Sequence, residues 1–430
     1  MEQKRSTRAK LIEFEPKKVE VNAKYNNIYY NGENNLYPNE YEAVMYASPT
    51  ALKAHSIKTK FIAGRGLKIN GVETKYKEQK SLNNKGHNVF DLVENASQSI
   101  SSQRGVFIWV GYGLKDGEII KKSYEVLDFS MCRISKEDSF ENAGKVYYGD
   151  FTKREAVKQW FYPFNDDPGA VASQIKKDFD IRKKDAKNKD IEFNLISAIE
   201  NYRGQVFYLN LDKNLVYPTH ALHAVYRYAD LEYQLSKYFN TNVKNGLLGK
   251  VAVLTQGLSD EVVKDVERDI REWLGPEGSD GVYHLDVTQA DNLDNVLKVI
   301  QVSSNYNEKQ FELTNKLAKN AIMGAFNVLP VLIDTADGAL FGTSGEAYEA
   351  AKTIQDDLTK SDRNAIENAF YKIGLDIEII PLTAIDEIVE EQEQQVIEEA
   401  VEEIVEENTI PENAQLKKTL YNRLKAILWK

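Results

Sequence analysis

Two histidines, His220 and His223, stand three residues apart, a spacing that would place both imidazoles on one face of a helix. Imidazole nitrogens bind zinc and other transition metals, so the pair could form part of a metal site. Such a site needs further ligands, and the sequence offers five histidines and a single cysteine, Cys132, none at a helpful spacing. We interpret the two histidines as structural and expect no metal and no other cofactor.

Two short motifs are candidates for nucleotide or nucleophile chemistry. The GYG sequence at 111–113 lacks the third glycine of GxGxxG, and the KDG sequence at 115–117 is typical of a β-hairpin turn. Ser344 precedes Gly345 and Glu346 but stands in no GxSxG frame. The GxxxxGK[ST] phosphate loop does not occur in the sequence, so we expect no ATPase of that kind.

The carboxylate pairs Asp166-Asp167 and Asp356-Asp357 could in principle perform acid–base chemistry. Such pairs are ordinary in a chain with 66 Asp+Glu against 55 Lys+Arg and a net charge of −11. Because no set of residues forms a catalytic constellation in the sequence, we predict that the protein is not an enzyme. An α+β hydrolase or transferase whose residues converge only after folding is the alternative.

The acidic balance also argues against a protein that binds nucleic acid by neutralising its phosphates. It is compatible with a protein that lets DNA slide past it. The YRY sequence at 226–228 has the interleaved basic and aromatic residues of a nucleic-acid-binding patch. Packing of aromatic side chains on an amphipathic helix explains the same pattern, and we favour that interpretation.

Length and composition indicate two or three compact units, because 430 residues exceed what one hydrophobic core usually organises. A single cysteine excludes an intrachain disulfide. The basic N-terminus, MEQKRSTRAK, lacks the apolar stretch of a signal peptide, and no apolar run approaches the ~18 residues of a membrane span. These features predict a soluble protein made in the cytoplasm.

The first half of the chain predicts a mixture of helices and strands. After an arm at 1–25 and a turn-rich stretch at 26–38, a helix follows Ser48-Pro49, with Thr50 as its cap and Gly64 at its end. The remaining elements are a helix at 90–101, strands within 105–129 joined by a hairpin turn, strands at 145–148 and 206–209, and a charged helix at 174–189. We interpret the charged helix as a solvated face.

The second half predicts longer helices around a small α/β unit. The elements, in order, are a helix at 219–240, a strand at 247–257, a helix capped by Ser259 and ending at 274, a strand at 282–287, a helix at 306–326, a loop, a helix from about Ser344, a helix at 362–373 and a strand at 375–382. Residues 386–407 then contain eleven Asp/Glu and no Lys/Arg while keeping an apolar helical stripe. A basic helix ends the chain, and the fold class is α+β.

This order of elements from 218 to 358 resembles the portal (head-to-tail connector) family of tailed bacteriophages. The sequence IMGAFNVLP at 322–330 is similar to an IARxFGVPPxLLG-like stretch of that family, with one proline where many members have two. A segment of small residues at 338–345, followed by Glu346, resembles the loop and helix start that come next. The resemblance extends over about 34–382.

The resemblance implies a portal fold in which each segment has a named place. We expect an arm at 1–25, the N-terminal part of a wing at 26–217, stem helices at 218–246 and 302–329, a clip at 247–301, a tunnel loop at 330–345, a tunnel helix with the C-terminal part of the wing at 346–383, and a crown at 384–430. The resemblance also implies residues that act on DNA or on a partner. For the tunnel loop at the DNA channel these are Asp334, Thr335, Asp337, Gly338, Leu340, Phe341, Gly342, Thr343 and Ser344. For docking of terminase at the clip they are Asp260, Lys264, Glu267, Arg268 and Arg271.

The function that the resemblance implies is a ring, expected to hold twelve subunits, at one capsid vertex of a virion. Double-stranded DNA would pass through it without sequence specificity during packaging and ejection. The expected partners are the terminase large subunit, the major capsid protein, and an adaptor or head-completion protein, with no membrane. The subunit would be made in the bacterial host cytoplasm. Another hypothesis is an oligomeric interaction protein that uses the acidic segment 386–407 as a coiled-coil partner.

Overall fold

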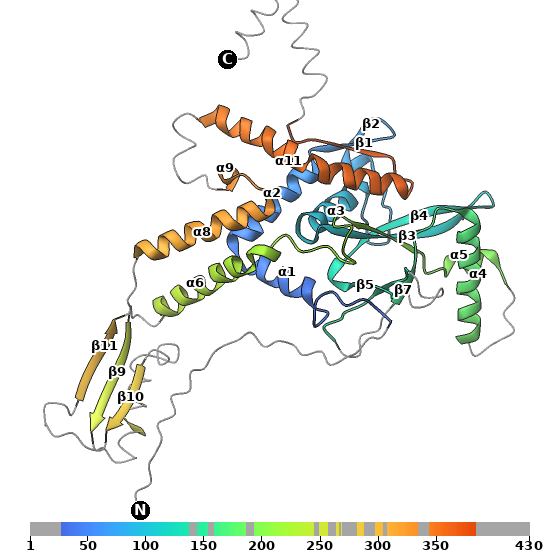
Figure 1. Ribbon diagram of the computed structural model, residues 1–430. Helices are drawn as coiled ribbons and strands as arrows, with labels where there is room; N and C mark the ends of the chain where they lie inside the picture. The colour runs from blue at the N-terminus through green and yellow to red at the C-terminus, as the bar shows by residue number, and fades with distance from the viewer. Residues whose placement is uncertain are drawn as a thin grey trace, which may run out of the picture.

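The computed structural model describes residues 27–136, 144–153, 159–185, 193–244, 249–256, 264–265, 268, 282–287, 297–303, 308–333 and 344–383. These residues form an α+β fold, as the sequence predicts. In Figure 1, a body of sheets and helices carries two long helices, α6 (Tyr226–Lys244) and α8 (Glu308–Phe326), and a separate small sheet lies beyond their far ends. No helix within the described ranges is long and apolar enough to cross a membrane.

The first two helices meet at Ser48. Helix α1 (Tyr37–Ala47) was not predicted, because its turn-forming Asn and Tyr residues hide a start at Tyr37-Pro38. Helix α2 (Pro49–Ala63) is capped by Ser48, whose Oγ accepts a hydrogen bond from the Ala51 N–H at 3.2 Å. The predicted cap at Thr50 is therefore wrong. Proline occupies the first helical position, where its missing N–H costs nothing, so the capping residue must precede it.

The predicted end of α2 at Gly64 is confirmed, and the structure shows why glycine is needed there. Gly64 has a φ of 70°, and a Cβ on it would lie 2.1 Å from the Ile380 carbonyl oxygen. The same carbonyl accepts a hydrogen bond from the Arg65 N–H at 2.9 Å. The turn leads into a three-stranded antiparallel sheet with the order β12-β1-β2. Its strands are β1 (Gly66–Ile69), β2 (Val72–Thr74) and β12 (Ile377–Ile380).

Helix α3 (Val89–Gln103) starts with a capping box in which Asn88 and Asp91 bond each other's backbone N–H groups. Strands β3 (Gly105–Lys115) and β4 (Glu118–Leu127) follow as the predicted hairpin. Its two turn residues, Asp116 and Gly117, both have positive φ values, 52° and 84°. This two-residue loop with two positive φ values is the hairpin connection whose twist matches that of the strands.

The hairpin forms one edge of a six-stranded sheet with the order β4-β3-β8-β7-β6-β5. The other strands are β5 (Cys132–Ile134), β6 (Val146–Tyr148), β7 (Gln159–Pro163) and β8 (Gln205–Asn210), and only the β7–β8 pair is parallel. Helices α4 (Pro168–Asp185) and α5 (Leu195–Glu200) form the connection that a parallel pair requires. The predicted helix at 174–189 is confirmed but starts earlier. Three short 3₁₀ turns are η1 (Tyr76–Glu78), η2 (Phe129–Met131) and η3 (His223–Val225).

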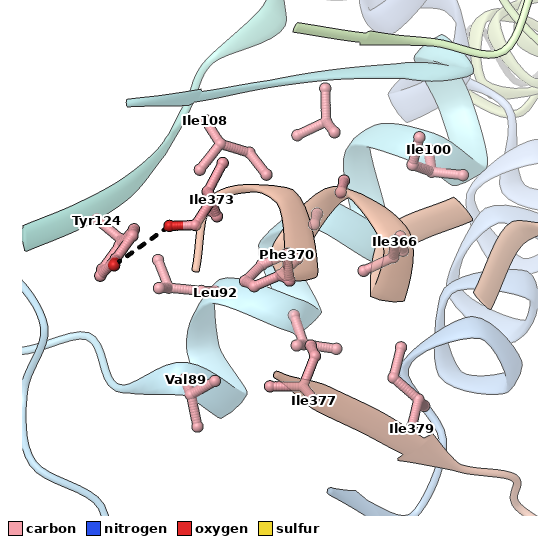
Figure 2. Close-up of a cluster of buried hydrophobic side chains, with 14 of the residues drawn as sticks. Val89, Leu92, Ile100, Ile108, Tyr124, Ile366, Phe370, Ile373, Ile377 and Ile379 are labelled. Atoms are coloured by element: carbon pink, nitrogen blue, oxygen red, sulfur yellow. Dashed lines mark hydrogen bonds between the residues drawn. The ribbon is translucent and has the colours of Figure 1, made fainter. Parts of the chain in front are cut away.

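The largest hydrophobic core joins segments from the two ends of the described chain. Figure 2 shows side chains of α3, β3 and β4 packed against the C-terminal part of α11 (Ser344–Lys372) and against β12. Ile366 and Phe370 of α11, and Ile373 directly after the helix, are fully buried in it. The Tyr124 hydroxyl donates a hydrogen bond to the Ile373 carbonyl oxygen at 3.4 Å. Residues beyond 360 are thus part of the same core as residues near 100.

The predicted helix at 219–240 starts later than expected: the η3 turn precedes α6, whose first residue is Tyr226. Strand β10 (Val282–Val287) has the predicted bounds, and β9 (Gly249–Gln256) nearly does. A third strand, β11 (Leu297–Ser303), was not predicted; it pairs antiparallel with β9, while β10 pairs with β9 in parallel. Because β11 reaches Ser303, the expected stem boundary at 302 falls inside a strand.

Two further helix boundaries differ from the expectation. The returning helix ends at Phe326, as predicted for the helix at 306–326 but before the expected stem boundary at 329, and the separate short helix α9 (Pro330–Ile333) follows. The helices predicted from Ser344 and at 362–373 are one helix, α11, of 29 residues. Residues 264, 265 and 268 are helical, as predicted for that segment, whereas Ser259, the arm at 1–25 and the C-terminal helices of 384–430 lie outside the described residues.

Candidate functional site

The candidate site is the junction of α2, α6, α8, α9 and α11, from which the segment 334–343 leaves α9 and enters α11. Helix α8 ends because Asn327 adopts a left-handed conformation, with a φ of 59°. The Val328 N–H donates to the Met323 carbonyl at 3.0 Å and so closes the last turn. Pro330, which lacks an N–H, then starts α9. The chain therefore changes direction at a fixed point before the segment begins.

The side chain of Gln355 on α11 holds this change of direction in place. Its Oε1 accepts a hydrogen bond from the Leu329 N–H at 3.1 Å, and its Nε2 donates to the Asn327 carbonyl at 3.0 Å. Gln355 is fully buried, so water cannot replace either bond. One amide thus satisfies both a donor and an acceptor of the backbone that the break between α8 and α9 leaves unpaired.

Helix α9 is packed onto α2 and α11. Leu332 lies in a small apolar cluster with Phe61 of α2 and Ala351 of α11. The Lys53 ammonium donates a hydrogen bond to the carbonyl oxygen of Ile333, the last residue before the segment, at 2.5 Å. A cation at a helix C-terminus is favourable because it opposes the partial negative charge of the last carbonyls. The departure point of 334–343 is consequently bonded to a neighbouring helix.

Helix α11 contains a buried ion pair between Asp356 and Arg363, with 3.1 Å between Oδ1 and Nη1. The guanidinium also donates to the Phe61 carbonyl at 2.8 Å and to the Thr359 hydroxyl at 2.9 Å. The other Asp356 oxygen accepts from the Thr383 N–H at 2.8 Å and from the Thr383 hydroxyl. Because a buried charge is costly unless its hydrogen bonds are complete, this pair fixes α11 relative to α2 and to the residues after β12.

Helix α6 is attached to the start of α2 through Glu232. Its carboxylate accepts a hydrogen bond from the Ser48 hydroxyl at 2.6 Å and from the Thr50 N–H at 3.2 Å. A carboxylate at a helix N-terminus is stabilised by the unpaired N–H groups and the helix dipole. An apolar cluster completes the contact between α1, α2, α6 and α8; its fully buried members include Leu222, Ala229, Ile322 and Phe326. The helix pair α6–α8 is thereby held to the body by both polar and apolar contacts.

The two histidines examined in the sequence lie in and before η3, not on one face of a helix as their spacing suggested. His220 Nδ1 accepts from the Leu222 N–H at 3.1 Å, and burial, with His55 and His223 nearby, lowers the pKa of His220 to about 3. His223 Nδ1 lies 2.9 Å from the Tyr37 hydroxyl. Both histidines contact the ring of Tyr41. Their role in the structure is to join α1 to the start of α6, and no metal-binding group of three or more His, Cys, Asp or Glu occurs among the described residues.

A buried serine–histidine pair, Ser101 and His55, has the separation expected of a nucleophile and its base, 3.1 Å between Oγ and Nδ1. Ser101 is fully buried, and its hydroxyl also donates to the His55 carbonyl at 3.3 Å. No substrate can reach it, so the pair is a contact between α2 and α3. Burial, with Lys58 nearby, lowers the pKa of His55 to about 4.

A polar cavity of about 340 Å³ lies between α1, α3 and the end of β4. Glu42 lines it and accepts a hydrogen bond from the Gln103 amide at 2.8 Å. Burial raises the pKa of Glu42 above its usual range. Asp128, another lining residue, caps η2 through the Ser130 N–H at 2.9 Å. These carboxylates bond an amide and a backbone group. His55 also lines the cavity, whereas its hydrogen-bond partner Ser101 does not.

The structure places only part of each predicted site. Ser344 is the first residue of α11, while the other predicted tunnel-loop residues lie outside the described residues. Of the predicted clip residues, Lys264 and Arg268 are exposed and helical, and Arg268 forms a 3.0 Å salt bridge with Asp265. Asp260, Glu267 and Arg271 lie outside the described residues. The sequence analysis missed Gln355, Arg363 and Glu232 and considered Asp356 only as half of a carboxylate pair; their signal is polar residues that interrupt the apolar stripes of two helices.

The YRY sequence at 226–228 divides between two environments. Tyr226 packs against Tyr41 with 4.9 Å between ring centroids, as the packing interpretation predicts. Arg227 and Tyr228 are exposed. The GYG sequence at 111–113 lies within β3, at an irregularity in its pairing with β4, and the Tyr112 hydroxyl donates to Gln205 at 2.7 Å. Neither segment forms a loop that could hold a phosphate.

Comparison with known proteins gives no matching family model and no matching curated protein. Several solved structures align with most of this chain. One is an HK97 family phage portal protein from Corynebacterium diphtheriae, with 13% identity, 80% of this chain and 97% of that chain covered, and a TM-score of 0.39. A chain from the neck of an empty gene transfer agent particle has 14% identity, coverages of 87% and 90%, and a TM-score of 0.45. A chain from the virion of a native gene transfer agent particle has 12% identity, coverages of 94% and 97%, and a TM-score of 0.43.

Proposed function

We propose that this protein is a phage portal subunit, which forms a ring at one capsid vertex and lets DNA enter and leave through a central channel. The observation that carries the proposal is the order of elements α6, small sheet, α8, α9, segment 334–343 and α11. This is the order of stem, clip, stem, tunnel loop and tunnel helix to which the sequence is similar. The proposal assigns no catalytic step to this chain.

The dimensions of the helices suit such a ring. Helices α6 and α8 have 19 residues each, which corresponds to about 28 Å at about 1.5 Å per residue. They run side by side away from the body, and the sheet β10-β9-β11 lies beyond them (Figure 1). Copies arranged around an axis through head-to-tail contacts would place these helix pairs as the wall of a channel. The family leads us to expect twelve copies.

The segment 334–343 is the part of the subunit that we assign to the channel. Before the segment, Lys53 bonds the carbonyl of Ile333 and Gln355 bonds the backbone between α8 and α9; after it, the chain continues as α11, which Asp356 and Arg363 fix to the body further along the helix. Its sequence, DTADGALFGT, combines two glycines with an apolar Leu-Phe pair. A segment of this composition can contact passing DNA through apolar atoms without binding phosphates tightly. The net charge of −11 likewise favours sliding over binding.

The energy for packaging must come from another protein, because the sequence holds no phosphate loop. We assign that role to the terminase large subunit, docking at the clip around Lys264 and Arg268, which are exposed. An adaptor or head-completion protein and the major capsid protein are the other partners of the proposal. The virion is the expected location.

Electron microscopy of the purified protein tests the ring directly. Negative-stain images should show closed rings with a central channel and cyclic symmetry. A protein that stays a monodisperse monomer under all assembly conditions would contradict the proposal.

Deletion of residues 337–343 tests the channel assignment. The rings should still assemble, because the contacts at the junction lie outside the deletion, but packaging or retention of DNA should fall. A variant in which the same seven positions become Gly and Ser serves as the control for length. Normal infectivity of phage carrying the deletion would contradict the assignment of this segment to the channel.

A further inference from the structure

The polar cavity between α1, α3 and the end of β4 has a volume of about 340 Å³. Sites for small molecules usually have volumes of about 300–1,000 Å³, so the cavity is large enough for such a ligand. It opens to solvent beside Tyr46, which is 64% exposed. Part of its wall belongs to α3, whose apolar residues lie in the largest core. The fold itself therefore holds this wall in place.

Two carboxylates in the cavity wall each have one oxygen that accepts no hydrogen bond. Glu42 Oε1 accepts from the Gln103 amide at 2.8 Å, and Asp128 Oδ1 accepts from the N–H and the hydroxyl of Ser130. The other oxygens, Glu42 Oε2 and Asp128 Oδ2, accept from no described residue. Burial raises the pKa of Glu42, and the charge of Asp128 raises it further. The two carboxylates thus repel each other across the cavity, and a cation between them would relieve that repulsion.

The other charged groups of the wall leave this negative charge uncompensated. Lys85 Nζ lies 2.6 Å from Glu125 Oε1, so its charge is paired with that carboxylate. Burial lowers the pKa of His55 to about 4, so its imidazole is uncharged at neutral pH. Glu42 and Asp128 therefore give the cavity an excess of negative charge, which favours a positively charged ligand.

A buried amide, which carries no charge, indicates the same kind of ligand. Gln103 lines the cavity and is only 2% exposed. Its Nε2 donates to Glu42, whereas its Oε1 accepts from no described residue. That oxygen is not sealed off by protein atoms, so it is open to the cavity. Together with the two carboxylate oxygens it forms a set of acceptors without donors, and a ligand rich in N–H groups would satisfy all three.

The remaining wall favours an organic cation over a metal ion. Tyr46, Phe129 and Tyr148 line the cavity, and the faces of aromatic rings attract ammonium and guanidinium groups. A protein site for a metal ion usually brings several ligating side chains together. No group of three or more His, Cys, Asp or Glu within the described ranges could hold one. Carboxylates beside aromatic side chains are instead the surroundings that suit an alkylammonium or alkylguanidinium group.

We propose that this cavity binds an organic cation that ends in an ammonium or guanidinium group. The N–H groups of the cation donate to the free oxygens of Glu42, Asp128 and Gln103, and its carbon chain lies against the aromatic side chains. Such a group belongs either to a free amine or to a lysine or arginine side chain of a second copy of this chain. The cavity lies within one subunit, so the binding does not depend on the portal assignment.

Calorimetric titration of the full-length monomer tests the preference for charge. The two probes are butylguanidinium and butylurea, which have nearly the same size and shape but differ in charge. Butylguanidinium should bind at least about tenfold more tightly, because its hydrogen bonds to the carboxylates are charge-assisted. Equal affinities for the two probes, or no binding of butylguanidinium, would overturn the proposal.

A charge-removing variant places the binding in the cavity. Glu42→Gln/Asp128→Asn keeps an acceptor for Gln103 and for Ser130 but removes both charges, so the preference for butylguanidinium should disappear. Glu40→Gln/Glu118→Gln makes the same change of charge at exposed positions of α1 and β4 outside the cavity and should bind like the wild type. Circular dichroism checks that both variants are folded. If the two variants bound butylguanidinium equally, the cation would bind elsewhere and the proposal would be wrong.

The source of the cation follows from a comparison of monomer and ring, separated by size. If butylguanidinium binds to both forms, the natural ligand is a free amine. If it binds to the monomer alone and slows assembly of the ring, a basic side chain of a second copy occupies the cavity. Binding to the ring but not to the monomer would contradict the proposal, because the cavity is complete in one subunit. A protein that forms no ring but binds the cation would contradict the portal assignment alone.

Discussion

The core around α3 and the junction around α11 share one helix but are stabilised in different ways. The C-terminal end of α11 buries Ile366 and Phe370 among apolar side chains, and Ile373, directly after the helix, joins them. Nearer its N-terminus, the same helix uses Gln355, Asp356 and Arg363, each with several buried hydrogen bonds. Apolar packing depends on volume and accepts small rearrangements, whereas buried polar groups are stable in one geometry only. The comparison teaches that the junction is the region built for a fixed orientation.

Loss of the buried cation should have the largest effect. Arg363→Met leaves Asp356 buried without its partner and should lower the free energy of unfolding by about 3–5 kcal/mol. A conservative core change on the same helix, Ile366→Val, should cost only about 0.5–1.5 kcal/mol. Urea denaturation followed by circular dichroism measures both.

The double variant Asp356→Leu/Arg363→Met sharpens this result. Removing both charges avoids the unpaired carboxylate, so the double variant should be more stable than Arg363→Met alone. If the single and double variants were equally unstable, lost packing and not the unpaired charge would explain the loss.

Removal of the Gln355 amide should have an intermediate effect. Gln355→Leu keeps most of the side-chain volume but leaves the Leu329 N–H and the Asn327 carbonyl unpaired, at about 1–3 kcal/mol for the two together. The backbone around Pro330 should then exchange amide hydrogens faster than in the wild type. Lys360→Ala, at an exposed position of the same helix, is the control. Unchanged exchange at residues 328–333 would show that α9 is held by its apolar contacts alone.

The buried histidine at the start of α6 should make stability depend on pH to a smaller degree. The pKa of His220 is about 3 in the folded protein, against an ordinary value of 6.5, because burial disfavours the charged imidazole. The unfolded chain therefore binds a proton below about pH 6.5 that the folded chain does not bind. Stability is fully present above that pH and falls by up to about 1.4 kcal/mol per pH unit below it.

His220→Asn keeps an acceptor for the Leu222 N–H but removes the titrating group. Between pH 6.5 and 5, the slope of the unfolding free energy against pH should decrease by up to about 1.4 kcal/mol per pH unit, which corresponds to one bound proton. His55, whose pKa is about 4, should still contribute its own part of the slope. A slope identical to that of the wild type would contradict the assignment to His220.

Local patterns in the sequence were enough to predict the fold class and several elements. The hairpin at Asp116-Gly117, the helix end at Gly64 and strand β10 follow from turn chemistry and short-range periodicity. Helix α1 was missed, because its Tyr and Asn residues resemble a turn, whereas strand β11 was missed although its sequence, LKVIQVS, is rich in strand-forming Val and Ile. The cap predicted at Thr50 is two residues too late, because Pro49 occupies the first helical position and Ser48 before it is the cap.

The junction could not be predicted for a different physical reason. Arg363 donates to the Phe61 carbonyl, which lies 302 positions away, and Glu232 bonds Ser48, which lies 184 positions away. Nothing in the local sequence of either partner identifies the other, and single polar residues on a helix are normally solvated. The proposed channel segment and clip residues rest on the order of elements, so their roles stay predictions.

The pairing of β1 with β12 has a consequence for how the protein is made. Gly66 lies opposite Ile380, so the sheet β12-β1-β2 and the main core form only when residues more than 300 positions apart meet. Contacts this distant in sequence form late, after the entropy of closing a very long loop has been lost. During synthesis, the apolar face of α3 must wait for Phe370 and Ile379 to leave the ribosome. An unfinished chain therefore exposes that face, and we expect only chains that extend past Ile380 to take part in the proposed ring.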